Sequence, residues 1–288
     1  MFSAVLIIRN EESVLEKCLE SIKHYPLITE IVIVDTWSID RTKEIAKRYT
    51  KKIYDFKWCD DFSKARNFAK TKATNKWILS IDADETLETF FDEIPREKAD
   101  WYFVTLTNWL ETTTNACRIF RKELNWKWKI HEYIQPKNWL ETWVTIKFWR
   151  SPSHDVDPMR NLRILAQVYK ENPKDQRNLY YLWRELFSLW QYNEALEALR
   201  EYSSLPIDFH NKELVDSYFL QALCYYKLDK RAEATTMLWM VIIRNPFFSN
   251  WYKMLALLEK TDIIKQKWLE LEKQADNKWV LLNINLDM

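Results

Sequence analysis

The stretch EIVIVDTWSIDRTKEIAKRY, residues 30–49, decides the fold of the first half of the chain. Four apolar residues in a row, 31–34, are typical of a strand covered on both faces, and a turn and a helical segment follow. The same succession recurs on either side, with strands predicted at 4–8, 51–56 and 76–85 and helices at 13–22 and 62–73. Strands that alternate with helices predict an α/β domain with a mostly parallel sheet and right-handed crossovers.

The pattern changes twice after this sheet. Residues 101–150 contain aromatic-rich, strand-like pieces, and the chain becomes helical after the Pro-containing stretch 151–158. We therefore place a domain boundary there, with an α/β domain over 1–150 and a helical domain over 151–288. Ser13 is in position to cap the first helix.

The helical part contains a repeat of tetratricopeptide type. The repeat frame places characteristic residues at Leu182, Trp183, Tyr192 and Ala195, and then at Ala222, Tyr225, Ala234 and Pro246. The spacing from Ala195 to Ala234 exceeds the period of roughly 34 residues, which indicates an insertion. Helices at 160–171 and 249–274 would cap the array. An irregular helical bundle is the alternative.

The bulk composition excludes several functional classes. Lys plus Arg total 43 and Asp plus Glu total 42, so no overall field favours nucleic acid or an anionic membrane. The four cysteines form no CxxC pair, which favours reduced thiols. No segment approaches the length of a membrane span. These features predict a cytoplasmic protein that is at most peripheral to the inner face of a membrane.

Acidic residues at the end of the fourth strand carry the chemistry. Asp82 and Asp84 flank one residue there, and ligands of open α/β sheets bind at the carboxyl ends of strands. Two such carboxylates can hold Mg²⁺ or Mn²⁺ while a nucleotide diphosphate supplies further oxygens. A DxD motif alone is a weak signal, because most are solvated loop acids.

Polar residues at the other strand ends strengthen this prediction. Asp35 could accept hydrogen bonds from a base or ribose, and Arg66 could face a phosphate. Each residue also has an ordinary interpretation, such as a first-turn helix acid or a surface ion pair, but together they favour a site. The residues are Arg9, Asn10, Glu11, Asp35, Arg66 and Asn67.

Four motifs, AVLIIRNEESVLEKCLESI, EIVIVDTWSIDRTKEIAKRY, DDFSKARNFA and WILSIDADE, together resemble the family 2 glycosyltransferases. The chain is most similar to the group with a short GT-A domain followed by tetratricopeptide repeats, near bacterial lipopolysaccharide-core and bacteriocin peptide glycosyltransferases. The resemblance runs over 2–133, resumes at RSPSHDVDPMRNLRIL and includes the repeats.

The resemblance implies a metal-dependent, inverting transfer from a nucleotide-sugar donor to a glycan, lipid-linked or peptide acceptor. It implies Asp35 at the nucleoside, Arg66 near the base and phosphates, and Asp82 and Asp84 at the ribose and metal. The repeats could bind an extended peptide or a partner protein.

The segment WKWKIHEYI supplies two candidates for the acceptor side. His131 and Glu132 occupy the position of the IHE motif in the family that the chain resembles, which implies acceptor binding or base catalysis by one of them. A metal ligand or a structural histidine are the alternatives for His131.

Glycine is absent from the chain. A usage of roughly 7% would give about 20 glycines, whereas the chain has none and has 16 tryptophans. Where the family pattern has glycine, tryptophan stands at Trp37, Trp128, Trp149, Trp183 and Trp190. Our hypothesis is a gene in which UGA encodes glycine and was translated as tryptophan. A real indole at position 37 that stacks on the donor base is the alternative.

Two other functions compete with glycosyl transfer. A nucleotidyltransferase would be expected to carry a Gly-rich, basic signature near the first strand, where the sequence IIRNEE is acidic. A non-catalytic scaffold built on the repeats would need a degenerate sheet site, and the intact Asp82 and Asp84 argue against it.

Overall fold

The computed structural model describes residues 1–94, 99–108, 113–135, 137–149, 151–152, 156–205, 212–245, 249–259 and 262–274. The chain divides into two compact units, Met1–Arg160 and Asn161–Met288. The domain boundary expected between residues 150 and 151 stays a prediction.

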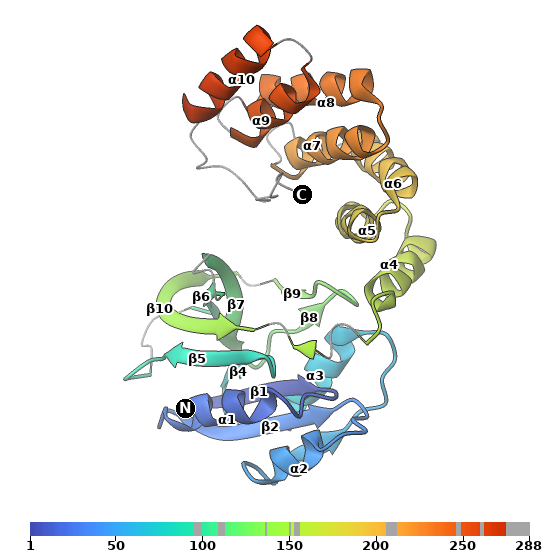
Figure 1. The fold of residues 1–288 in the computed structure, drawn as a ribbon. Helices are drawn as coiled ribbons and strands as arrows, with labels where there is room; N and C mark the ends of the chain where they lie inside the picture. Colours follow the sequence, from blue (N-terminus) through green and yellow to red (C-terminus); the bar gives the residue numbers. More distant parts are fainter. Residues whose placement is uncertain are drawn as a thin grey trace. The chain divides into compact units, whose positions relative to one another are not determined.

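An eight-stranded mixed sheet, as far as the structure describes the chain, forms the centre of the first unit (Figure 1). The strand order is β3-β2-β1-β4-β7-β6-β10-β5, and a separate ribbon pairs β8 with β9. The strands are β1 (Phe2–Ile8), β2 (Ile28–Asp35), β3 (Ile53–Asp55), β4 (Trp77–Ser80), β5 (Glu85–Thr89), β6 (Trp101–Thr107), β7 (Thr113–Arg121), β8 (Trp126–Lys127), β9 (Tyr133–Ile134) and β10 (Trp139–Phe148).

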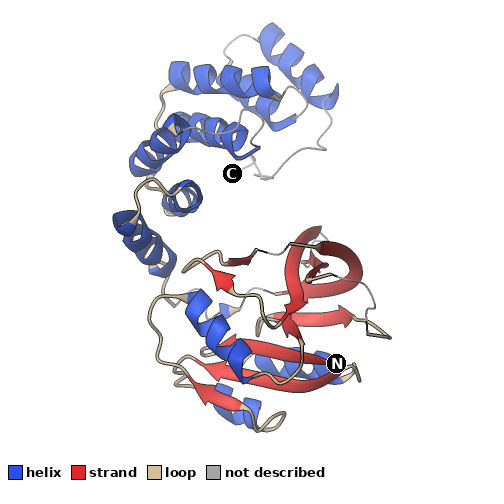
Figure 2. Ribbon diagram, turned by 180° about the vertical axis from the view of Figure 1, so that it is seen from behind, coloured by secondary structure: helices blue, strands red, loops and turns tan. Residues whose placement is uncertain are grey.

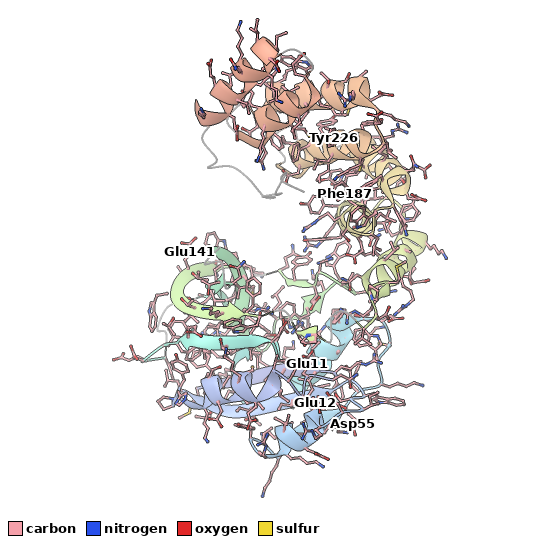
Figure 3. The ribbon with its side chains drawn as sticks, viewed as in Figure 1. Glu11, Glu12, Asp55, Glu141, Phe187 and Tyr226 are labelled. Carbon is pink, nitrogen blue, oxygen red and sulfur yellow. The ribbon has the colours of Figure 1, made fainter. Side chains whose placement is uncertain are left out.

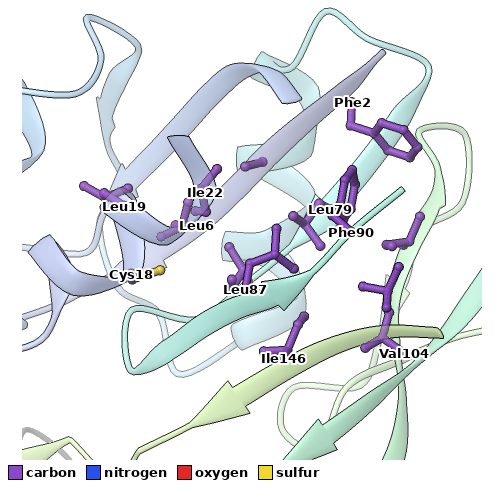
Figure 4. Close-up of a cluster of buried hydrophobic side chains, with 14 of the residues drawn as sticks. Phe2, Leu6, Cys18, Leu19, Ile22, Leu79, Leu87, Phe90, Val104 and Ile146 are labelled. Atoms are coloured by element: carbon purple, nitrogen blue, oxygen red, sulfur yellow. The ribbon is translucent and has the colours of Figure 1, made fainter. Parts of the chain in front are cut away.

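Helices cover both faces of the sheet around β1. Alternate β1 residues, such as Leu6, join a buried cluster with helix α1 (Leu15–Lys23) and helix α2 (Thr42–Lys47), part of which is drawn in Figure 4. Val5, which points to the opposite face, joins a second cluster with helix α3 (Phe62–Lys72). A strand buried on both faces reads as a continuous apolar run, which explains the sequence of β1 and β2.

The parallel part of the sheet positions the candidate site. Strands β3, β2, β1 and β4 are all parallel neighbours, and Ile8 of β1 is in register with Asp35 of β2. Their carboxyl ends therefore lie along one edge of the sheet. The loops that begin at residues 9, 36 and 81 leave from this edge, and they contain half of the predicted site residues, namely Arg9, Asn10, Glu11, Asp82 and Asp84.

The structure confirms the predicted α/β fold with a mostly parallel sheet. Beyond β4 the sheet is mixed, since β7 runs antiparallel to both β4 and β6 while β6 and β10 are parallel. Ser13 does not cap α1: the N-cap residue is Val14, with no side-chain hydrogen bond. By contrast, Asp61 caps α3, since its carboxylate accepts the Lys64 N–H at 2.9 Å.

The second unit is helical throughout its described residues, as expected (Figure 2). Helix α5 packs against α6, α7 against α8 and α9 against α10, in the order of a stack of helix pairs. The helices, of which α4 begins in the first unit, are α4 (Arg160–Glu171), α5 (Gln176–Ser188), α6 (Tyr192–Ser204), α7 (Lys212–Lys227), α8 (Arg231–Arg244), α9 (Ser249–Leu258) and α10 (Asp262–Gln274). Pro246 lies outside the described residues. None of the described helices has the length and apolar character needed to cross a membrane.

Candidate functional site at the carboxyl edge of the sheet

The loops after β1 and β2 are bonded to each other by side chains. The Asn10 carboxamide oxygen accepts the Ile39 N–H at 2.9 Å, and the Ser38 hydroxyl accepts the Asn10 N–H at 2.9 Å. The Glu11 N–H donates to the Thr42 hydroxyl at 2.7 Å. Asn10 has a φ of 55°, a left-handed conformation that asparagine tolerates better than most residues. The two loops therefore hold each other in one arrangement at the sheet edge.

Asp35 is buried at the end of β2 and organises the turn that follows it. Its carboxylate accepts the Trp37 N–H at 3.2 Å and the Ser38 N–H at 3.1 Å, while the Lys43 ammonium lies 3.8 Å away. Such bonds from an aspartate to the backbone two and three residues on are typical of Asx turns. Asp35 thus shapes the edge where a nucleoside was expected, and its contact with a nucleoside stays a prediction.

A cluster of five charged side chains lies beside the end of β4. The Arg66 guanidinium of α3 donates through Nη2 to Asp82 Oδ1 at 2.8 Å and through Nε to Glu132 Oε1 at 2.5 Å. Arg118 of β7 donates to Asp82 Oδ2 at 3.0 Å and also to Glu85. The cluster therefore carries two cations and three carboxyl groups, and Asp82 lies between the two arginines.

Burial and charge shift the carboxyl groups of this cluster in opposite directions. Burial by itself would raise the pKa of Asp82, but the charges of Arg66 and Arg118 hold it well below its usual range. Burial raises the pKa of Glu85 to about 7, against the opposing effect of Arg118. One carboxyl group is thus kept ionised and the other gains a proton near neutral pH, which is a common property of functional sites.

The backbone between Asp82 and Glu85 forms a closed turn. The Glu85 N–H donates to the Asp82 carbonyl at 3.1 Å, and the Asp82 N–H donates to Glu85 Oε2 at 2.9 Å. Asp84 lies within this turn and is half-buried. Its carbonyl accepts the Trp149 N–H at 2.7 Å, and its carboxylate is 3.4 Å from the Ser151 N–H. The segment after β10 therefore returns to the site beside Asp84.

Glu11, labelled in Figure 3, contacts the same returning segment. The Ser151 hydroxyl donates to Glu11 Oε2 at 2.6 Å, and Ser151 is fully buried. Arg9, by contrast, is exposed. Glu11 and Asp84 thus share Ser151 as a neighbour, although they come from different strand ends.

The acceptor-side candidates lie on a segment that α3 holds in place. Asn67 exchanges two hydrogen bonds of 2.9 Å with the backbone of Trp126, and the Phe62 N–H donates to the Lys129 carbonyl at 2.8 Å. Glu132 therefore reaches Arg66 from across the site. His131, the residue before Glu132, has a φ of 51° and is half-buried.

The role of Asp82 and Asp84 as ligands of a divalent cation stays a prediction. No group of three or more His, Cys, Asp or Glu that could hold a metal occurs among the residues that the structure describes. Both Asp82 oxygens already accept guanidinium hydrogen bonds. Mg²⁺ is commonly held by one or two carboxylates together with substrate phosphates, so Asp84 with a diphosphate suffices.

Two residues of the site were missed by sequence reasoning. Arg118 lies within β7 between Cys117 and Ile119, and a charge flanked by apolar residues was the signal that the sequence offered. Ser151 gave no signal, because its contacts depend on the path of the chain after β10. The structure brings Arg66, Asp82 and Glu132 together, whereas the contacts of the Asp35 carboxylate are with its own turn and with Lys43 of α2.

Residues 3–136 match the family model described as glycosyl transferase family 2. The SPbeta prophage-derived glycosyltransferase SunS of Bacillus subtilis is 28% identical over 249 residues, which cover 76% of this chain and 56% of SunS. An uncharacterized glycosyltransferase of Rickettsia bellii is 36% identical over 85 residues, or 30% of this chain and 28% of that protein. The chain thus spans only part of each of these relatives.

A TPR repeat-containing protein of Synechococcus elongatus is 45% identical over 85 residues, which are 30% of this chain and 21% of that protein. Among solved structures, S. aureus TarS 1–349 in complex with UDP-GlcNAc is 13% identical, with a TM-score of 0.49 over 82% of this chain and 88% of that chain. At this TM-score the similarity supports no conclusion about the present chain.

Proposed function

We propose that this chain, whose residues 3–136 match the glycosyl transferase family 2 model, moves a sugar from a nucleotide-diphosphate donor to a glycan, lipid-linked or peptide acceptor with inversion. The observation that carries the proposal is the meeting of Asp82, Arg66 and Glu132 at the carboxyl edge of a parallel sheet. Ligands of open α/β sheets bind at this edge. A displacement there needs stabilisation of the leaving diphosphate and a base for the acceptor proton.

The donor lies, in this proposal, along the loops after β1, β2 and β4. Asp35, Arg9, Asn10 and Glu11 contact the nucleoside side, since their loops form the edge next to the turn of Asp82. The two arginines that hold Asp82 keep it ionised, so it can accept hydrogen bonds from a ribose. Arg66 acts on the donor through the position of Asp82, because its guanidinium is already engaged by two carboxylates.

Asp84 is the proposed protein ligand of Mg²⁺ or Mn²⁺, and the donor phosphates complete the coordination. Bound there, the cation would supply charge stabilisation to the leaving diphosphate. In this proposal Asp82 fixes the turn that carries Asp84. The two aspartates therefore do not share the cation.

Glu132 is the proposed base, with His131 as the alternative. Glu132 Oε1 is held by Arg66, which fixes the carboxylate across the site from the turn of Asp82. A base must lie within hydrogen-bond reach of the proton that it removes, and a carboxylate fixed by one oxygen can present the other.

The experiment is a screen of the purified chain against nucleotide sugars, with glycan, lipid-linked and peptide acceptors and Mg²⁺ or Mn²⁺, in which the released nucleotide diphosphate is measured. We expect release with one donor class, loss of release in Asp84→Asn and in chelator, and unchanged release in Glu141→Gln, which alters an exposed carboxylate on β10 (Figure 3). Equal release by Asp84→Asn and the intact chain would contradict the metal assignment. Absence of release with every donor would contradict the transfer itself.

A further inference from the structure

Three tryptophans have a backbone conformation that suits glycine. Seven residues in the described part of the chain have positive φ, and four of these are Asn, Asp or His, the types most often found there. The other three are Trp37 at 74°, Trp128 at 75° and Trp190 at 65°. In this conformation Cβ approaches the following carbonyl oxygen, which disfavours every residue except glycine and, less strongly, Asn and Asp.

Trp190 occupies the position at which a helix most often ends in glycine. Its N–H donates to the Phe187 carbonyl at 3.0 Å, and the Gln191 N–H donates to the Leu186 carbonyl at 2.9 Å. These two bonds, with the left-handed residue Trp190 as the first of the two donors, define the Schellman motif at the end of α5. Glycine is the usual residue at this position because it has no Cβ.

The chain contains a matched example of the same motif at the end of α7. The Asp229 N–H donates to the Tyr226 carbonyl at 3.0 Å, the Lys230 N–H donates to the Tyr225 carbonyl at 2.8 Å, and Asp229 has a φ of 56°. The position equivalent to Trp190 is therefore filled by a residue that tolerates the conformation. The indole of Trp190 is also 76% exposed, so burial does not compensate for the strain.

Trp37 stands in the turn that Asp35 organises. Its own N–H is one of the donors to the Asp35 carboxylate, which requires the backbone to keep this path, and its indole is 60% exposed beside the candidate donor site. Trp128 begins the short segment between β8 and His131. At Trp37 the backbone serves a specific turn, and at both positions Cβ is disfavoured by the left-handed conformation.

Other tryptophans of the chain have clear structural reasons for being tryptophan. Trp77 is buried against Phe2 and Tyr102, with the Arg121 guanidinium 3.9 Å from its ring centroid. Trp251 is buried and its indole N–H donates to the Asn245 carbonyl at 3.0 Å. Neither has positive φ. Two kinds of tryptophan are therefore present in one sequence.

We propose that the natural protein carries glycine at positions 37, 128 and 190, where codons that its source reads as glycine were translated as tryptophan. The backbone selects these three positions without reference to any family pattern, and all three are among the five that the sequence motifs indicated. The chain has no glycine in 288 residues, and the proposal returns glycine to three positions whose backbone conformation suits it. Position 37 lies beside Asp35 at the proposed donor site, so glycine there leaves more space for the nucleoside. This consequence rests on the proposed function.

The backbone conformation does not single out Trp149 and Trp183, since neither has positive φ. Each has a buried indole N–H without a hydrogen-bond partner, but Trp101, which no motif marks as glycine, shares this property. Glycine at these two positions stays a prediction from the motifs.

The first test is the gene. UGA at codons 37, 128 and 190, with UGG at codons 77 and 251, would support the proposal. UGG at the first three codons would overturn it. This outcome is independent of whether the chain transfers a sugar.

The second test compares side chains at one position in the full chain. Trp190→Gly removes both the indole and the Cβ, whereas Trp190→Ala removes only the indole. We expect glycine to raise the folded-to-unfolded ratio roughly 5- to 30-fold over alanine, since the left-handed conformation costs that much for a residue with Cβ. Trp251→Gly, the control, should lower this ratio. Equal stability of the glycine and alanine variants at position 190 would overturn the backbone argument.

Discussion

Replacing Arg66 by methionine tests how firmly the ion cluster holds Glu132. Arg66 is 9% exposed and binds both Glu132 and Asp82, so the substitution leaves Glu132 without this cation while Asp82 keeps Arg118. Removing one partner of a buried ion pair typically costs about 3–5 kcal/mol. Because Asp82 retains its second arginine, we expect the lower end, about 3 kcal/mol. This is a large part of a stability of about 5–15 kcal/mol.

The double variant separates the pair from the general effect of losing a buried side chain. Arg66→Met combined with Glu132→Gln leaves no uncompensated charge at Glu132, so its loss of stability should be smaller than the sum of the single losses. Contacting residues in one charge network show coupling of about 0.5–3 kcal/mol, and we expect a value in the upper half of this range.

Urea unfolding of the four proteins measures this cycle, provided that the slope with denaturant stays constant. A loss of about 3 kcal/mol should also lower the midpoint of thermal unfolding by about 6–12 °C. Arg48→Met is the control, since Arg48 pairs with Glu16 on the surface and such pairs contribute at most about 1 kcal/mol. Coupling below about 0.5 kcal/mol would refute the view that Arg66 positions Glu132.

Two further predictions concern the same edge. The folded-state pKa of Glu85 is raised from 4.5 to about 7, so the stability that it contributes at low pH should be lost as the pH rises through 7. The free energy of unfolding should fall by about 3 kcal/mol over this window in the intact chain but not in Glu85→Gln, and a parallel pH dependence of the two would contradict the shift. Ser151→Ala removes the hydrogen bond to the Glu11 carboxylate, which should cost roughly 1.5–3 kcal/mol in urea unfolding. Ser204→Ala, which removes an exposed hydroxyl, is the control, and an equal loss in both variants would contradict a specific contact.

Local sequence patterns were sufficient to predict the strands and helices of the parallel half of the sheet. The apolar run of β2 and the helical spacing around α3 are properties of neighbouring residues, and the parallel order makes their ends meet at one edge. The positions of Asp35 and Asp82 at strand ends followed directly. What the side chains contact there did not follow, since Asp35 binds its own turn.

The contacts that close the site join distant parts of the sequence. Arg66 and Glu132 are 66 positions apart, and Arg118 reaches Asp82 only because β7 runs antiparallel to β4, with Phe120 opposite Ile78. A periodic pattern reports which face of an element is buried, but it does not report which element lies opposite. The mixed half of the sheet, and with it the role of Arg118, was therefore beyond reach without the structure.

The ribbon of β8 and β9 pairs only with itself among the described strands and is fastened to α3 through Asn67 and Lys70. Glu132 is consequently located by a helix and not by the register of the main sheet. Strand β6 contributes no side chain to the charged cluster, so its loops could change in length while Arg66 and Glu132 keep their contact. The fold thus separates loops that can vary in length from the segment carrying Glu132, which must keep its contacts with α3.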